Sequence, residues 1–148
     1  MMTVDDLVFP ILHFEPGFVS AARSADELLT TTMTPVKSGY YRNQLLVDST
    51  GNAVRIKDAK KLHHIGRFWG YDMLLVQHIR MELIFKGEPF EMPLEELRKK
   101  TLSALRFSFG AIDPDYAREM KQRLRDAQSA SEIVGLVVEL DDASRVRK

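Results

Sequence analysis

The sequence predicts a single α+β domain in which helices cover one face of a mainly antiparallel sheet. Three observations lead to this class. Residues 41–57 alternate in polarity around a turn, the residues after Pro93 carry apolar stripes of helical period, and strand signals precede helix signals along the chain. A length of 148 residues suits one domain, whose ends at 1–6 and 141–148 we expect to be frayed.

The clearest hairpin signal lies in the middle of the chain. Side chains alternate between two faces over 41–47 and again over 53–57, as a pleated strand requires. Between these runs, Asp48 can accept local backbone hydrogen bonds, and Gly51 can adopt a positive φ without steric cost. The pattern therefore predicts two antiparallel strands joined by a turn of about five residues.

The segment before the hairpin combines an apolar run with turn and cap signals. Residues 7–14 are apolar, but Pro10 donates no ladder hydrogen bond, so we expect an edge strand or an irregular segment. The Glu-Pro-Gly triplet at 15–17 predicts a turn. Ser24 and Glu27 have the spacing of a capping box, which predicts that a short helix begins there.

Two further strand segments, either separate strands or parts of one long bent strand, are expected after the hairpin. Asp58 can cap a short turn of helix over 59–63. The run 71–76 is nearly all apolar, which is typical of a strand covered on both faces, and 79–85 alternates again. Pro89 is expected to end this second strand because it lacks an amide proton.

Three helices are predicted to close the chain. The first begins at Pro93 and ends at Gly110, with one apolar stripe facing the sheet. Asp113 caps the second, and a capping box at 129–132 opens the third. Residues 133–140 are also compatible with a strand, because valines and a glycine interrupt the helical pattern.

Composition excludes several classes of protein. The chain has no Cys, so it can form neither a disulfide nor a thiolate site. Lys and Arg number 21 and so do Asp and Glu, and a formal net charge of zero argues against a dedicated nucleic-acid binder. Acidic residues precede the first apolar run, unlike a secretory signal, and no apolar run approaches the ~20 residues that span a bilayer. We therefore expect a cytoplasmic protein with no membrane partner.

The strongest candidate for a binding site is an aromatic, basic stretch between two glycines. Trp, Tyr and Arg are the commonest anchors of protein interfaces, and a loop between strands can present them to a partner. The candidate partner-binding residues are Arg67, Phe68, Trp69 and Tyr71, together with the neighbouring His63 and His64. The competing interpretation is that Trp69 is a buried structural residue.

Other functions find less support in the sequence. Adjacent histidines point in different directions and no recognised ligand spacing accompanies them, so we predict no metal and no cofactor. The basic residues of loop 57–71 lie beside aromatic residues, which is the chemistry of a nucleic-acid surface. A small enzyme or ligand-binding protein with a pocket between sheet and helices is a further alternative, although no catalytic residue can be named.

The central pattern resembles small bacterial α+β domains that are similar to immunity proteins of polymorphic toxin systems. The resemblance covers about residues 20–140. It rests on Gly39-Tyr40-Tyr41, Leu45-Leu46-Val47-Asp48, Gly51, Ile56, Asp58-Ala59, Lys61-Leu62, Phe68-Trp69-Gly70-Tyr71, Ile79-Arg80, Glu82-Leu83, Phe85 and Leu94–Leu97. Such proteins bind and block a toxin made by the same cell, so the resemblance implies a protein partner and no catalytic residue.

Overall fold

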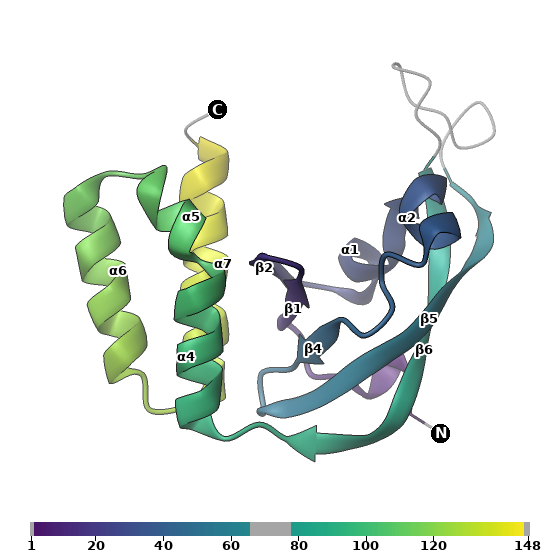
Figure 1. Cartoon of the computed structure of the whole chain (residues 1–148), viewed down its shortest axis with the longest axis horizontal. Coiled ribbons are helices and arrows are strands. Elements are labelled where there is room, and N and C mark those ends of the chain that lie inside the picture. The colour runs from purple at the N-terminus through teal and green to yellow at the C-terminus, as the bar shows by residue number, and fades with distance from the viewer. Residues whose placement is uncertain (1, 66–77, 147–148) are drawn as a thin grey trace.

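A computed structural model of the chain describes residues 2–65 and 78–146 (Figure 1). Six strands form one antiparallel sheet in the order β2-β1-β4-β5-β6-β3. The strands are β1 (Ile11–Glu15), β2 (Phe18–Ala22), β3 (Thr30–Thr32), β4 (Leu45–Val47), β5 (Asn52–His64) and β6 (His78–Glu91). The predicted α+β class with an antiparallel sheet is confirmed.

Helices from both the N-terminal and the C-terminal part of the chain pack against this sheet. They are the 3-10 helix η1 (Val4–Asp6), α1 (Ala25–Leu29), α2 (Met33–Ser38), α4 (Leu94–Ala104), α5 (Arg106–Gly110), α6 (Pro114–Asp126) and α7 (Ala130–Val146). The last four helices pack together beside β1 and β2, whereas α1 and α2 lie inside the curve of the long β5–β6 pair (Figure 1).

The alternation of side chains divides the interior into two cores on opposite faces of the sheet. In β4, Leu45 and Val47 pack against the C-terminal helices, and Leu46 packs on the other face with α1. In β1, Leu12 belongs to the first core and Ile11 to the second. Because both faces of these short strands are covered, they contain almost only buried apolar residues.

The predicted reversal between β4 and β5 is confirmed, and Asp48 organises it. Its carboxylate is buried and accepts hydrogen bonds from the amides of Thr50 (2.9 Å) and Asn52 (3.1 Å). It also accepts from the amide of Val8 at 3.2 Å, which ties the N-terminal segment to the turn. Gly51 has φ +92°, the region in which glycine is preferred.

Several strand boundaries differ from the sequence prediction. Strand β1 lies between β2 and β4, so the expectation of an edge strand was wrong; Pro10 stands just before the paired residues and leaves the ladder intact. The predicted strand over 41–47 shortens to β4 because Asn43 has φ +67°. Residues 59–63 extend β5 and form no helix, since pairing with β6 overrides the local cap signal at Asp58.

Strand β6 continues through the predicted break at Pro89. Ala53 pairs with Phe90 and Arg55 with Lys86, so residues 87–89 lie opposite a single residue of β5. This bulge accommodates Pro89, and the hydrogen-bonded pairing of β5 with β6 continues on both sides of it. The predicted strand over 71–76 lies outside the described residues.

The caps of the C-terminal helices follow the sequence closely. The side chain of Asp113 accepts from the amide of Asp115 at 2.9 Å, and Pro114 is the first residue of α6. The hydroxyl of Ser129 accepts from the amide of Glu132 at 3.2 Å. Residues 133–140 are helical, and α7 continues to Val146. The first predicted helix divides at Leu105 into α4 and α5.

Candidate binding groove

Of the six candidate residues, His63 and His64 belong to the described part of the chain, at the end of β5. Arg67, Phe68, Trp69 and Tyr71 fall outside the described residues. His63 is an exposed residue of β5 and pairs with Arg80 of β6. His64 follows it in the same strand. His63 and His64 thus occupy consecutive positions of β5.

A different surface brings basic and aromatic residues together. Three adjoining hollows of about 300, 290 and 500 Å³ run from α5 across the β1–β2 turn and β4 to β6, each sharing residues with the next. We call this surface the basic groove. Its charged and aromatic lining residues are Phe14, Glu15, Phe18, Arg42, Arg55, Lys57, Phe85, Lys86, Lys100, Arg106 and Phe107.

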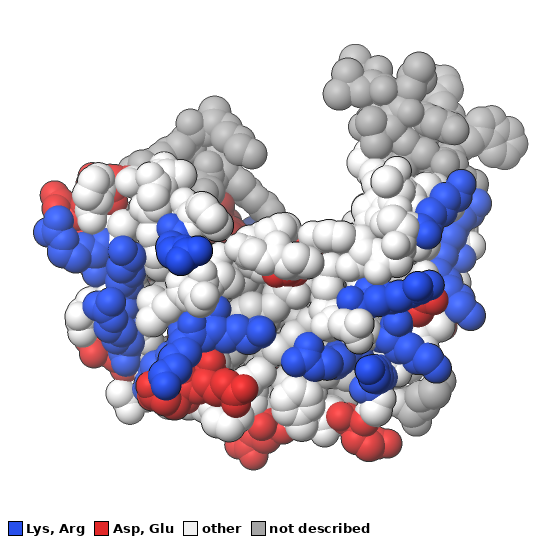
Figure 2. Space-filling view, viewed as in Figure 1, with Lys and Arg blue, Asp and Glu red and all other residues white. Residues whose placement is uncertain are grey.

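Sheet geometry explains why cations gather at one end of the groove. Residues 53–57 alternate, so Val54 and Ile56 enter the core beneath α1 and α2. Arg55 and Lys57 point to the opposite face, where the C-terminal helices no longer cover the sheet, and both are exposed. Figure 2 shows Lys and Arg side chains spread over this face, from the helices on one side to the long strands on the other.

Helices α4 and α5 supply the other end of the groove. Lys100 lies with its ammonium 5.3 Å from the centre of the Phe14 ring, and the guanidinium of Arg106 lies 5.5 Å from that of Phe107. Phe107 is 74% exposed, the most exposed of the large hydrophobic side chains that the structure describes. Phe18, on the β1–β2 hairpin, is 44% exposed and lines the same hollow.

Most of these cations have no acidic partner in the part of the chain that the structure describes. Arg42 pairs with Asp58 at 3.3 Å, and a hydrogen bond from the Ala59 amide together with Arg42 lowers the pKa of Asp58. Within 2–65 and 78–146, no carboxylate lies at ion-pair distance from the remaining five, which are Arg55, Lys57, Lys86, Lys100 and Arg106. The guanidinium of Arg55 donates only to the carbonyl of Asn43.

Glu15 is the one carboxylate among the described lining residues of the groove. Partial burial and the negative charge of Glu15 raise the pKa of Tyr40. Behind Glu15, His13 is buried and its Nε2 lies 2.5 Å from the Oε1 of Gln44. Burial lowers the pKa of His13 despite the opposing effect of Glu15. His13 and Gln44 therefore form a polar pair beside the groove, since Gln44 also lines its middle hollow.

A polar hollow of about 250 Å³ lies between α1 and α7 and is the nearest match to the expected pocket between sheet and helices. Two of its three acidic groups have a structural task. Asp141 accepts from the amide of Ala21 at 3.1 Å, and Glu27 accepts from the amide of Arg23 at 3.3 Å. These carboxylates satisfy backbone donors at and just beyond the open edge of β2, which protects that edge from pairing with another strand.

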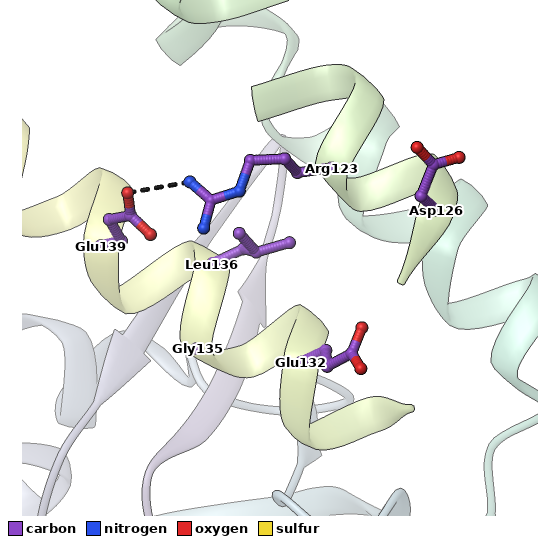
Figure 3. A pocket seen from close by; sticks show the side chains of 6 residues that line it. All are labelled: Arg123, Asp126, Glu132, Gly135, Leu136 and Glu139. Carbon is purple, nitrogen blue, oxygen red and sulfur yellow. Dashed lines mark hydrogen bonds and ion pairs between the residues drawn. The ribbon is translucent and has the colours of Figure 1, made fainter. Parts of the chain in front are cut away.

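The largest acidic hollow, of about 460 Å³, lies between α6 and α7 (Figure 3). Asp126, Glu132 and Glu139 line it, and Arg123 reaches across from α6 to Glu139 at 3.0 Å. We call it the acidic cleft. Its single cation is already paired, and this hydrogen bond raises the pKa of Arg123. The ion pair in the cleft therefore links two helices of the same chain.

The part of the chain that the structure describes offers little support for a metal site or a membrane-spanning segment. No group of three His, Asp or Glu side chains there is placed to hold a metal ion. No described helix is long and apolar enough to cross a membrane. Neither the known protein families, nor the curated proteins, nor the solved structures contain a match to this chain.

Sequence reasoning missed the groove because its parts come from distant segments. Lys100 and Arg106 belong to a helix pair that the sequence assigns to core packing, and Arg55 to a hairpin. One local signal was present. Phe107 falls off the apolar stripe that includes Phe109, and an aromatic residue on the polar face of a helix indicates an exposed ring.

Proposed function

We propose that this protein is a non-catalytic binding domain that docks another protein in the basic groove, as an immunity protein docks and blocks a bacterial toxin. One observation carries the proposal: Phe18 and Phe107 are exposed beside cations that have no acidic partner among the described residues. Aromatic and arginine side chains contribute most of the binding energy at protein interfaces, and such exposed combinations favour an interaction surface.

The dimensions of the groove suit a protein partner. A stable interface buries about 800 Å² on each side, which is more than a small-molecule pocket offers. The three hollows run side by side from α5 to β6, and all three are partly open to solvent. Blocking a toxin requires only that such a surface complements the partner, so the proposal needs no reaction centre.

The direct test is co-expression with the products of the genes encoded beside this one. We expect one of them to arrest growth, and the present chain to restore growth and to form a stable complex by gel filtration with light scattering. Phe107→Asp removes an exposed ring, so it should leave folding intact but abolish both effects. Lys99→Glu on α4, outside the groove lining, is the control. Absence of rescue and of any complex would contradict the proposal.

A further inference from the structure

We infer that the basic groove receives an acidic polypeptide segment of the partner, whose carboxylates pair with the groove cations and whose apolar side chain enters between Phe18 and Phe107. This inference rests on the proposed function and adds the chemistry of the partner. It also predicts the direction in which the partner segment lies. The apolar side chain of the segment is at the α5 end of the groove, and its acidic side chains extend towards β6.

Charge is the first argument for an acidic occupant. The described lining contains six cations and one carboxylate, although the whole chain has a net charge of zero. Like charges gathered on one face repel one another, and an acidic partner relieves that repulsion. Arginine also binds carboxylates through two parallel hydrogen bonds, which gives such a groove geometric selectivity.

The hollow beside α5 is the second argument. Phe14 forms its floor beneath Lys100, and the exposed rings of Phe18 and Phe107 stand beside it. Its volume of about 300 Å³ lies at the lower end of ligand pockets and is large enough for one apolar side chain. Covering these two exposed rings removes apolar area from water, which favours binding without adding charge.

Glu15 indicates a polypeptide and argues against a nucleic acid. It lies where the first two hollows meet, so a continuous phosphate backbone that followed the cations would pass close to a carboxylate. A polypeptide can place a neutral or basic residue opposite Glu15 and acidic residues on either side. Of the aromatic lining residues, Phe14 is buried and Phe85 is partly buried, so the exposed rings of Phe18 and Phe107 sit together at one end. Single-stranded nucleic acids instead use stacking rings spaced along the groove.

The test is a selection that needs no knowledge of the partner. Random displayed peptides of about 16 residues, long enough to follow the groove, are selected on the full-length chain and counter-selected on Arg55→Glu/Lys100→Glu. We expect enriched peptides to carry several Asp or Glu residues and one terminal Phe, Leu or Met. The most enriched peptide is then synthesised, and its affinity is measured by fluorescence anisotropy at low and high salt.

Matched variants decide where the synthetic peptide binds. Arg55→Glu/Lys100→Glu should weaken affinity by about tenfold or more, and added salt should weaken it further. Arg125→Glu and Lys99→Glu, exposed cations outside the groove lining, should change it less than about twofold. If charge reversal perturbs folding by circular dichroism, Arg55→Gln/Lys100→Gln replaces it and should still weaken binding severalfold.

Several results would overturn the inference. They are enrichment of peptides without acidic residues, affinity that survives Arg55→Glu/Lys100→Glu, or binding of a 16-nucleotide oligo-dT with the same sensitivity to these variants. The inference can also fail while the proposed function holds. If the neighbour-encoded protein binds, loses binding with Phe107→Asp and keeps it with Arg55→Glu/Lys100→Glu, the proposed function stands and the acidic segment is wrong.

Discussion

The basic groove and the acidic cleft are both charged hollows, yet they use charge in opposite ways. In the cleft, Arg123 of α6 is paired with Glu139 of α7, so charge holds two helices of the same chain together. In the groove, Arg55 and Lys100 have no acidic partner among the described residues. The difference teaches that ion pairing within the chain, and not charge density alone, separates structural charge from charge available to a partner.

The largest expected effect contrasts two phenylalanines of α5. Phe109 is buried among the C-terminal helices, so Phe109→Ala should lower the free energy of unfolding by about 3–4 kcal/mol. Phe107 is exposed in the groove, so Phe107→Ala should change it by less than about 0.5 kcal/mol. Urea denaturation of both variants measures this. A large loss with Phe107→Ala would mean that its ring serves the fold and would weaken the groove as an interface.

Gly135 tests whether the acidic cleft receives a partner. A Cβ at this helical position meets no atom within 4 Å, so Gly135→Ala should raise the free energy of unfolding by about 0.5–1 kcal/mol through helix propensity. The same variant should rescue growth as well as the parent protein in the co-expression assay. Loss of rescue with a stabilised fold would point to the cleft as the docking surface.

The ion pair of the cleft should have a smaller effect. Arg123 and Glu139 are each almost half exposed, and surface pairs of this kind contribute about 0.2–1 kcal/mol. Arg123→Ala should therefore destabilise the folded protein slightly, as measured by thermal unfolding. High salt should reduce the difference in stability between this variant and the parent protein. Arg55→Ala, at a cation without a carboxylate partner, should cost less than Arg123→Ala. If Arg55→Ala and Arg123→Ala lowered stability equally, the groove cation would serve the fold as much as the cleft cation does. That result would contradict the distinction between the basic groove and the acidic cleft.

The last expected effect is a weak pH dependence of stability that arises from the buried His13. Burial lowers the pKa of His13 in the folded state, so the unfolded chain gains a proton first as the pH falls. Stability from this group is therefore complete above about pH 6.5 and declines below it. Stability from Asp58, whose pKa is lowered in the folded state, is present above about pH 4 and declines only at more acidic pH.

The control for this dependence is a variant that cannot titrate. Urea denaturation at pH 7.5 and 5.5 should show a smaller difference for His13→Gln than for the parent protein, because glutamine keeps a polar group beside Gln44 without binding a proton. An unchanged difference between the two pH values would exclude His13 as its source.

Local chemistry explains what could be predicted from the sequence. Asp48 and Gly51 specify the hairpin, and Asp113 and Ser129 specify helix starts, because each acts on backbone groups a few residues away. The helix expected over 59–63 failed because long-range pairing with β6 determines that segment. Local signals thus fixed turns and caps but left strand lengths open.

The candidate site depended almost wholly on tertiary structure. Lys100 and Arg55 are 45 positions apart, and they line one hollow only because β1 and β4 bring the helices against the hairpin. The sequence indicated a protein-binding function and placed it at Arg67–Tyr71, outside the described residues. What it lacked was the order of strands, which determines the residues that meet across the sheet.

Hydrogen exchange on the complex with the selected acidic peptide tests the central claim most directly. If the groove is the docking surface, backbone amides of 14–18, 42–45, 54–57 and 100–107 should exchange more slowly in the complex, and those of 123–139 should be unchanged. Protection confined to 123–139, with the groove amides unaffected, would place the partner in the acidic cleft and contradict the account.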